Sequence, residues 1–195
     1  MSAQLKTHWI SVEEYLAIEE NSGIKHEYIN GEIYAMSGSS ARHNQIAGNL
    51  FARLLNHLRG SPCQVFIADV KLHLREVGVE MLYYPDLMVC CDPDDRHPYY
   101  RMRPCLIVEV LSSETACTDR QEKLFAYTRL DSVQGYLLLE QDQMRAILHS
   151  REAGQWQRTE FSDPQGELTL PCTGLTIQLA ELYEGAGLPE TPRAV

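Results

Sequence analysis

Ile107–Leu111 reads Ile-Val-Glu-Val-Leu and places an acid inside an otherwise apolar stretch. The surrounding run Cys105–Leu111 is rich in β-branched residues, which predicts a strand covered on both faces. A carboxylate in such a strand costs several kcal/mol unless a cation or hydrogen bonds compensate it. Glu109 therefore marks either a cation site or a buried acid that is paired with an arginine.

A second acid lies in the apolar run Met81–Cys91, which also predicts a buried strand. This acid is Asp86, in the sequence Tyr84-Pro85-Asp86. If the two strands are adjacent, Asp86 and Glu109 together would form a strong cation site. The alternative is that Asp86 caps a turn at the end of its strand.

A lysine follows in the first turns of a helix predicted over Thr118–Leu130, with Thr118 or Asp119 as its N-cap. Lys123 shares a helical face with Tyr127, and that face should point inward. An amine beside two carboxylates suggests phosphodiester chemistry rather than storage of an ion. The alternative is an exposed pair between Lys123 and Asp119, worth only a few tenths of a kcal/mol.

The sequence Asn30–Gly31 predicts a tight hairpin, because both residues tolerate the positive φ of a type I′ turn. In the register that this turn sets, Glu27 faces Tyr34 on the opposite strand. Glu27 and Glu32 then share one face of the ribbon, where they become candidate carboxylates for the site. The alternative for Glu27 is an ordinary acid on a surface ribbon.

The remaining elements follow from helical spacing, strand alternation and turn residues. They are helices over 11–18 and 42–59, strands over 63–74 and 133–140, a hairpin turning at 153–154, short strands over 167–170 and 175–179, and a helical turn over 180–184. This order predicts an α/β fold with a mixed central sheet flanked by helices. Additional antiparallel strands are expected at the N-terminal hairpin and in the C-terminal part.

The length of 195 residues predicts a single domain over 1–195. Within it we expect a core over about 42–140, preceded by a helix and hairpin over 11–36. A β-rich extension should follow over 141–184. The Gly- and Pro-containing tail over 185–195 is expected to be frayed.

The formal net charge of -10 argues against an unaided nonspecific nucleic-acid binder, because Lys and Arg dominate such affinity. It leaves room for an enzyme that uses a divalent cation and a local basic strip. The longest apolar runs are too short to span a membrane, and the first residues, Met1–Lys6, contain no apolar segment of a secretion signal. We therefore expect a cytoplasmic protein without membrane contact.

The sequence contains six cysteines, and they form neither a Cys-x-x-Cys pair nor a zinc-type spacing with histidines. Most of them lie in or beside apolar strand-like runs. We therefore expect reduced cysteines that serve as small core residues.

Taken together, these stretches resemble the PD-(D/E)XK nuclease superfamily and, more narrowly, the putative restriction endonuclease family of bacteria. The resemblance runs from about Val12 to Glu140. The matching stretches are Glu13–Leu16, Glu27–Glu32, Arg42–Asn44, Tyr84–Val89, Ile107–Ser113 and Asp119–Tyr127. The superfamily signature has a lysine two residues after the acid of the third strand, where this chain has Leu111. The resemblance implies that Lys123 takes its place in space.

The resemblance implies a restriction endonuclease-like fold and a Mg²⁺-dependent site, with Mn²⁺ as a substitute. Mg²⁺ prefers oxygen ligands, which the carboxylates of Asp86 and Glu109 and the carbonyl of Val110 would supply. Lys123 would polarise the attacking water and stabilise the phosphoryl charge. Glu27 is the candidate for a further catalytic carboxylate.

Further residues are expected to support the site or to contact nucleic acid. The supporting candidates are His43, Asp119 and Glu32, and the nucleic-acid candidates are Arg96, Arg101 and Arg103. The three arginines lie in a stretch that also contains tyrosines, which suits phosphate contact and base stacking. The alternative for the arginines is a solvated hairpin loop. The alternative for His43 is a structural role, which is common for a lone histidine.

These expectations favour a metal-dependent endonuclease that hydrolyses phosphodiester bonds of DNA, with RNA left open. One alternative is a catalytically inactive nuclease-fold protein that acts by binding nucleic acid or protein. Another is a plain metal-binding structural domain. Because cleavage of both strands requires two active sites, a homodimer is expected.

Overall fold

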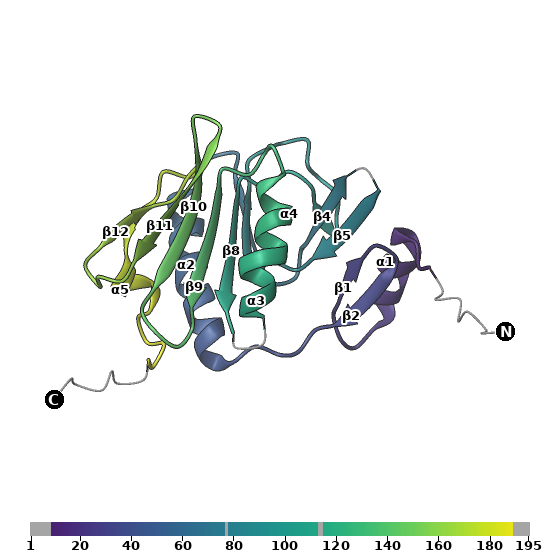
Figure 1. Ribbon diagram of the computed structural model, residues 1–195, viewed down its shortest axis with the longest axis horizontal. Helices are drawn as coiled ribbons and strands as arrows, with labels where there is room; N and C mark the ends of the chain where they lie inside the picture. Colours follow the sequence, from purple (N-terminus) through teal and green to yellow (C-terminus); the bar gives the residue numbers. More distant parts are fainter. Residues whose placement is uncertain (1–8, 77, 113–114, 189–195) are drawn as a thin grey trace.

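The computed structural model describes residues 9–76, 78–112 and 115–188 of the chain. Its centre is a mixed six-stranded sheet in the order β11-β10-β9-β8-β6-β3 (Figure 1). These strands are β3 (Gln64–Ile67), β6 (Leu87–Cys90), β8 (Leu106–Leu111), β9 (Gly135–Glu140), β10 (Ala146–Glu152) and β11 (Gln155–Phe161). Strands β8 and β9 are parallel, and the other neighbours in this sheet are antiparallel. The structure therefore confirms the α/β fold with a mixed central sheet.

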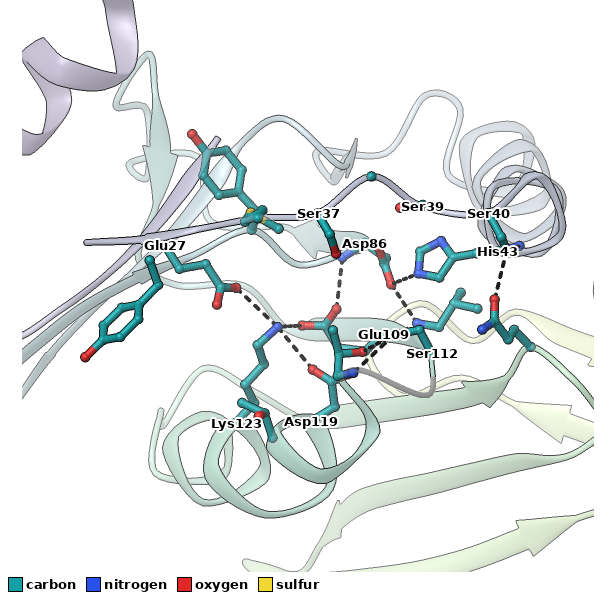
Figure 2. A pocket seen from close by; sticks show the side chains of 18 of the residues that line it. Glu27, Ser37, Ser39, Ser40, His43, Asp86, Glu109, Ser112, Asp119 and Lys123 are labelled. Carbon is teal, nitrogen blue, oxygen red and sulfur yellow. Dashed lines mark hydrogen bonds and ion pairs between the residues drawn. The ribbon is translucent and has the colours of Figure 1, made fainter. Parts of the chain in front are cut away.

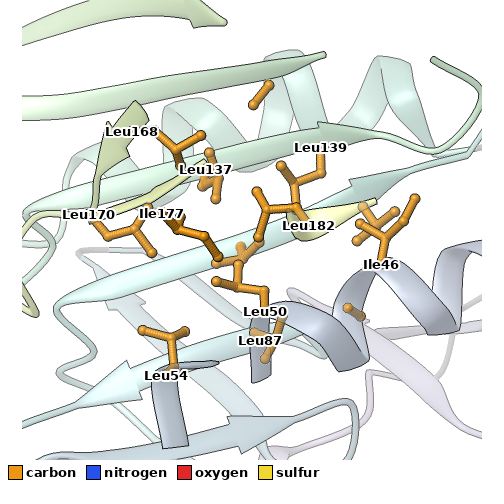
Figure 3. Packing of buried hydrophobic residues seen from close by; sticks show 14 of the residues in the cluster. Ile46, Leu50, Leu54, Leu87, Leu137, Leu139, Leu168, Leu170, Ile177 and Leu182 are labelled. Atoms are coloured by element: carbon orange, nitrogen blue, oxygen red, sulfur yellow. The ribbon is translucent and has the colours of Figure 1, made fainter. Parts of the chain in front are cut away.

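One face of the sheet packs against α2 (Ala41–His57), α5 (Leu179–Leu182) and the hairpin of β12 (Glu167–Thr169) and β13 (Thr176–Gln178). Figure 3 shows side chains of α2 meeting leucines of β6 and β9 in this core. Val108 and Val110 of β8 point to this face, because alternate residues of a strand face opposite sides. Glu109 lies between them in sequence and faces the other layer.

That other layer is a helix made of α3 (Ala116–Thr118), η1 (Asp119–Lys123) and α4 (Leu124–Thr128). It connects the parallel strands β8 and β9, which need such a crossover. Its middle turn, η1, is π-helical, a form that often marks functional sites. The predicted N-cap at Thr118 or Asp119 is wrong, because the preceding turn is already helical and extends the helix back to Ala116.

A second sheet has the order β2-β1-β5-β4-β7 and lies beside the first. Its strands are β1 (His26–Ile29), β2 (Glu32–Ala35), β4 (Lys71–Glu76), β5 (Val79–Tyr83) and β7 (Tyr100–Arg101), and α1 (Val12–Asn21) packs on it. The predicted β1–β2 hairpin is confirmed, with Glu27 opposite Tyr34. Both turn residues, Asn30 and Gly31, have positive φ.

Two predicted strands are each divided in the structure. The strand expected over 63–74 becomes β3 and β4, which belong to different sheets and are separated at Ala68, whose φ is 58°. The strand expected over 81–91 becomes β5 and β6, separated around Pro85, which lacks the N–H needed for a sheet ladder. A continuous apolar run cannot reveal that the chain passes from one sheet to the other.

The cysteine prediction is wrong for four of the six residues. The structure contains two disulfides, Cys63–Cys91 and Cys105–Cys172, while Cys90 and Cys117 are free. The fraying predicted from Gly185 is also wrong at its start, because Ala186 is buried in the core. The rest of that prediction, 189–195, lies outside the described residues. Within the described part of the chain, none of the helices has the length and apolar character to cross a membrane.

Candidate active site

The two strand acids meet at one end of the central sheet. Leu87 of β6 pairs with Val108 of β8, which places Asp86, just before β6, beside Glu109. The Asp86 N–H donates to Glu109 Oε2 at 3.3 Å, and the Val110 N–H donates to Asp86 Oδ2 at 2.7 Å. Each acid is therefore held by the backbone of the other acid's segment.

Lys123 reaches this pair from the π-helical turn. Its Nζ lies 3.1 Å from Glu109 Oε1, 3.1 Å from Asp119 Oδ1 and 3.3 Å from Glu27 Oε1 (Figure 2). The residue is only 5% exposed, so this is not the surface pair that was the alternative. Burial works against the ammonium, but attraction to Glu109, Glu27 and Asp119 outweighs it and raises the pKa of Lys123.

Leu111 occupies the strand position that carries the lysine in the superfamily signature. It is 2% exposed and packs in the apolar cluster between the sheet and the crossover helix. The amine of Lys123 thus arrives from the helix, above the same sheet face, as the resemblance implied.

Glu27 enters the site from the β1–β2 hairpin. Burial raises its pKa, and Lys123 partly offsets this effect. Burial also raises the pKa of Glu109 well above its usual value; Lys123 opposes this rise, whereas Asp119, Asp86 and Glu27 add to it. The acids therefore repel one another, and Lys123 offsets this repulsion for Glu27, Glu109 and Asp119.

His43 approaches Asp86 from the opposite layer. It lies in the first turn of α2, which is capped by Ser40, and its Nε2 is 3.1 Å from Asp86 Oδ2. Burial disfavours the charged ring, but the hydrogen bond and charge of Asp86, aided by the Val110 backbone, outweigh it and raise the pKa of His43. His43 is thus a partner of Asp86 rather than an isolated core histidine.

These groups line one open cavity of about 370 Å³. Its rim includes the loop 36–40, whose serines were not among the predicted site residues, and Ser112, which directly follows β8. Tyr127 was also missed as a partner of Glu109, to whose Oε1 it donates at 3.2 Å. Its spacing of four residues from Lys123 was the signal, because such residues share a helix face.

The acid-rich donor set fits a hard divalent cation. Four carboxylates line the cavity: those of Glu27, Glu109 and Asp119 contact the amine of Lys123, and that of Asp86 contacts His43. In the part of the chain that the structure describes, Glu27 Oε1 and Asp119 Oδ1 are buried and have no hydrogen bond apart from their ion pairs with Lys123. Carboxylate oxygens are the ligands that Mg²⁺ and Mn²⁺ prefer, and a cation would offset the excess negative charge.

Four of the predicted site residues lie elsewhere. Glu32 is exposed, accepts a hydrogen bond from Tyr34 and does not line the cavity, which β2 reaches only with its last residues. The loop with the three arginines follows β6 and precedes β8, so it lies at the opposite end of the sheet.

Each of these arginines is engaged within its own region. Arg101 is buried, where it donates to backbone carbonyls and covers the ring of Phe66. Arg103 pairs with Asp92, and Arg96 donates to the Pro93 carbonyl. These arginines therefore do not line the acid cavity, since a basic composition does not reveal where a loop lies, and their contact with nucleic acid stays a prediction.

A restriction endonuclease-like nuclease fold is the class that this sheet and its helices define. The chain belongs to the Uma2 family, described as putative restriction endonuclease, whose model matches residues 12–180. An uncharacterized protein of Synechocystis sp., slr1290, is 36% identical over 178 residues, covering 90% of this chain and 92% of the relative. A second one, sll1609, is 33% identical over 167 residues, covering 83% and 93%.

A solved structure shares the fold at low sequence identity. It is the crystal structure of a putative nuclease belonging to DUF820 from Anabaena variabilis. The TM-score is 0.73 with 17% identity, and the match covers 90% of this chain and 98% of the other.

Proposed function

We propose that the protein is a Mg²⁺-dependent endonuclease that hydrolyses phosphodiester bonds of DNA. The observation that carries the proposal is the meeting of Lys123 Nζ with Glu109 Oε1 at 3.1 Å, beside Asp86. A structural metal site does not require a buried amine beside its ligands. Hydrolysis of a phosphodiester benefits from one, because the amine can stabilise the negative charge that develops on the phosphoryl group.

The acids would hold the cation. Asp86 and Glu109 offer carboxylate oxygens and Val110 a carbonyl, all at the wall of one cavity. When bound, the divalent cation would supply Lewis-acid activation of water and of the phosphate. His43 and the Val110 N–H fix the Asp86 carboxylate in place for this task.

Lys123 and Glu27 would handle charge and water. The Lys123 ammonium is kept charged by its three acid neighbours, so it can stabilise the phosphoryl oxygens or orient the attacking water. Glu27, whose pKa is raised, is suited to receive a proton from that water. Asp119 positions the amine from one turn earlier in the helix.

The substrate and assembly complete the proposal. DNA phosphates would be repelled by the acid cluster alone, so binding near the cavity should require the cation. We propose a homodimer, since cutting both strands takes two such sites, and a cytoplasmic location, where DNA is available to a bacterial-type nuclease.

The test is incubation of the purified protein with supercoiled plasmid and Mg²⁺ or Mn²⁺, with a parallel single-stranded RNA reaction. Asp86→Asn should lower cleavage by at least about 100-fold. Glu32→Gln, an exposed acid outside the cavity, is the matched control and should cleave like the wild type. Equal cleavage by the wild type and Asp86→Asn would overturn the proposed enzymatic activity. No cleavage by the wild type, with DNA binding retained in a gel-shift assay, would do the same and favour a binding protein.

A further inference from the structure

Four cysteines gather at the end of the central sheet that is remote from the acids. Cys63 precedes β3, Cys91 follows β6 and Cys105 precedes β8, and these three strands are neighbours in the sheet. Cys172 comes from the turn between β12 and β13. Four segments that are distant in sequence therefore deliver sulfur to one place.

The two bridges lie in contact: three of the four sulfurs cluster together, and the fourth, of Cys63, is bonded to one of them. Cys63 is paired with Cys91 and Cys105 with Cys172, yet Cys91 Sγ lies only 3.6 Å from Cys105 Sγ. The sulfurs of Cys91, Cys105 and Cys172 all lie within 4.8 Å of one another. Two independent disulfides do not require such contact, whereas a shared ligand does.

We propose that the reduced chain binds one Zn²⁺ through the four thiolates of Cys63, Cys91, Cys105 and Cys172. A tetrahedral site with Zn–S bonds of about 2.3 Å places its sulfurs about 3.8 Å apart, close to the observed contact. Thiolates are soft ligands that select zinc over Mg²⁺, so this site is chemically distinct from the carboxylate cavity.

The chemistry of loading is a proton exchange. A dithiol reductant first gives two electrons and two protons to each disulfide, which leaves four thiols. As Zn²⁺ enters, four Zn–S bonds form, four S–H bonds break and the protons go to solvent. The metal and the thiolates keep their oxidation states.

The backbone at Cys172 supports a role for this cluster. Its φ is 58°, in the left-handed region that a non-glycine residue occupies at a cost. Such a conformation persists where the surroundings hold it, often at ligand clamps. Cys172 is exposed, so a metal could enter from its side and then tie the β12–β13 hairpin to the sheet.

The test uses the full chain purified anaerobically with reductant. We expect one zinc per chain by elemental analysis, and the visible absorption of tetrahedral thiolate-bound Co²⁺ after exchange with cobalt. Cys172→Ser, in an exposed turn, should lose both signals while keeping the far-ultraviolet circular dichroism of the wild type. Loss of the metal should also lower the Tm.

Matched controls separate this site from the remaining ligands. Cys117→Ser changes a free, exposed cysteine and should keep the zinc, and Asp86→Asn should keep it too. The proposal is overturned if the reduced protein binds no stoichiometric zinc, if Cys172→Ser retains it, or if Asp86→Asn removes it. An iron–sulfur chromophore in the isolated protein would overturn the assignment of zinc.

Discussion

The ammonium of Lys123 lies at the meeting point of three carboxylates, and its removal has two opposite consequences. Lys123→Met should lower plasmid cleavage by about 100- to 1,000-fold, because charge on the phosphoryl group loses its partner. The same change leaves the acids more negative, so half-maximal Mg²⁺ occupancy should need less metal. Isothermal titration and cleavage assays measure these effects.

Lys25 provides the control for this prediction. It is a half-exposed lysine whose ammonium pairs with Asp69 outside the cavity. Lys25→Met should therefore leave both the cleavage rate and the Mg²⁺ affinity unchanged. Cleavage by Lys123→Met at the wild-type rate would show that the amine of Lys123 takes no part in the proposed hydrolysis.

His43 gives the site a pH-dependent stability. Its folded pKa is raised above the ordinary 6.5, so its contribution is fully present below about pH 6.5 and is lost as pH rises through the folded pKa. His43→Asn should therefore cost more free energy of unfolding at about pH 6 than at about pH 9. Urea denaturation of metal-free protein at both pH values measures the difference.

Asp86 is the cause of most of that rise, so it supplies the control. In an Asp86→Asn background the loss caused by His43→Asn should become nearly independent of pH. A loss that grows toward high pH in the wild-type background would contradict the described contact between His43 and Asp86.

At the scale of elements, the β1–β2 hairpin carries Glu27 to the cavity and depends on one glycine. Gly31 has a φ of 91°, and a Cβ at this position would lie 2.5 Å from the ring of Trp9. Gly31→Ala should cost at least about 1–3 kcal/mol of stability and reduce cleavage by displacing Glu27. Chemical denaturation and the plasmid assay test both parts.

The β10–β11 hairpin offers a matched glycine. Gly154 has a φ of 81° at the equivalent turn position, but no atom lies within 4 Å of its would-be Cβ. Gly154→Ala should pay only the backbone strain, about 1 kcal/mol, and leave cleavage intact. An equal loss of stability in both variants would mean that the contact of Trp9 with Gly31 does not stabilise the β1–β2 hairpin.

Local chemistry explains which elements were predictable. The hairpin at Asn30–Gly31 and the helix expected from residue 11, which Ser11 caps, were predicted correctly, because a few neighbouring residues set their conformation. The split strands were missed, because leaving one sheet for another is decided by distant partners. The disulfides were missed for the same reason, since Cys105 and Cys172 are 67 residues apart.

The site was largely predictable because its chemistry is unusual for a core. Asp86, Glu109 and Lys123 stood out as charged groups in or beside apolar runs, and the structure brings all three together. The basic loop stood out equally by composition, but Arg101 donates to a nearby backbone carbonyl and Arg103 pairs with Asp92. Sequence reveals the type of a side chain better than its direction.

At the scale of the whole molecule, the acid cluster concentrates part of the net charge of -10 in one cavity. Mg²⁺ should therefore stabilise the fold as well as support cleavage. At free Mg²⁺ of about 100 times its Kd the gain is about 2.7 kcal/mol, or a Tm rise on the order of 5–10 °C. Differential scanning calorimetry with increasing Mg²⁺ measures this rise.

Two variants test whether the rise in Tm comes from Mg²⁺ bound in the cavity. Glu32→Gln should keep the Mg²⁺-dependent rise in Tm, because its carboxylate lies outside the cavity. Asp86→Asn should lose most of it. A similar rise in both variants would point to nonspecific screening of surface charge.

The amine of Lys123 and the apolar side chain of Leu111 belong to different elements, the crossover helix and β8. Under the proposed function, the demands of chemistry and of core packing therefore fall on separate segments of the chain. A change of either segment can then be made and measured with the other left as it is.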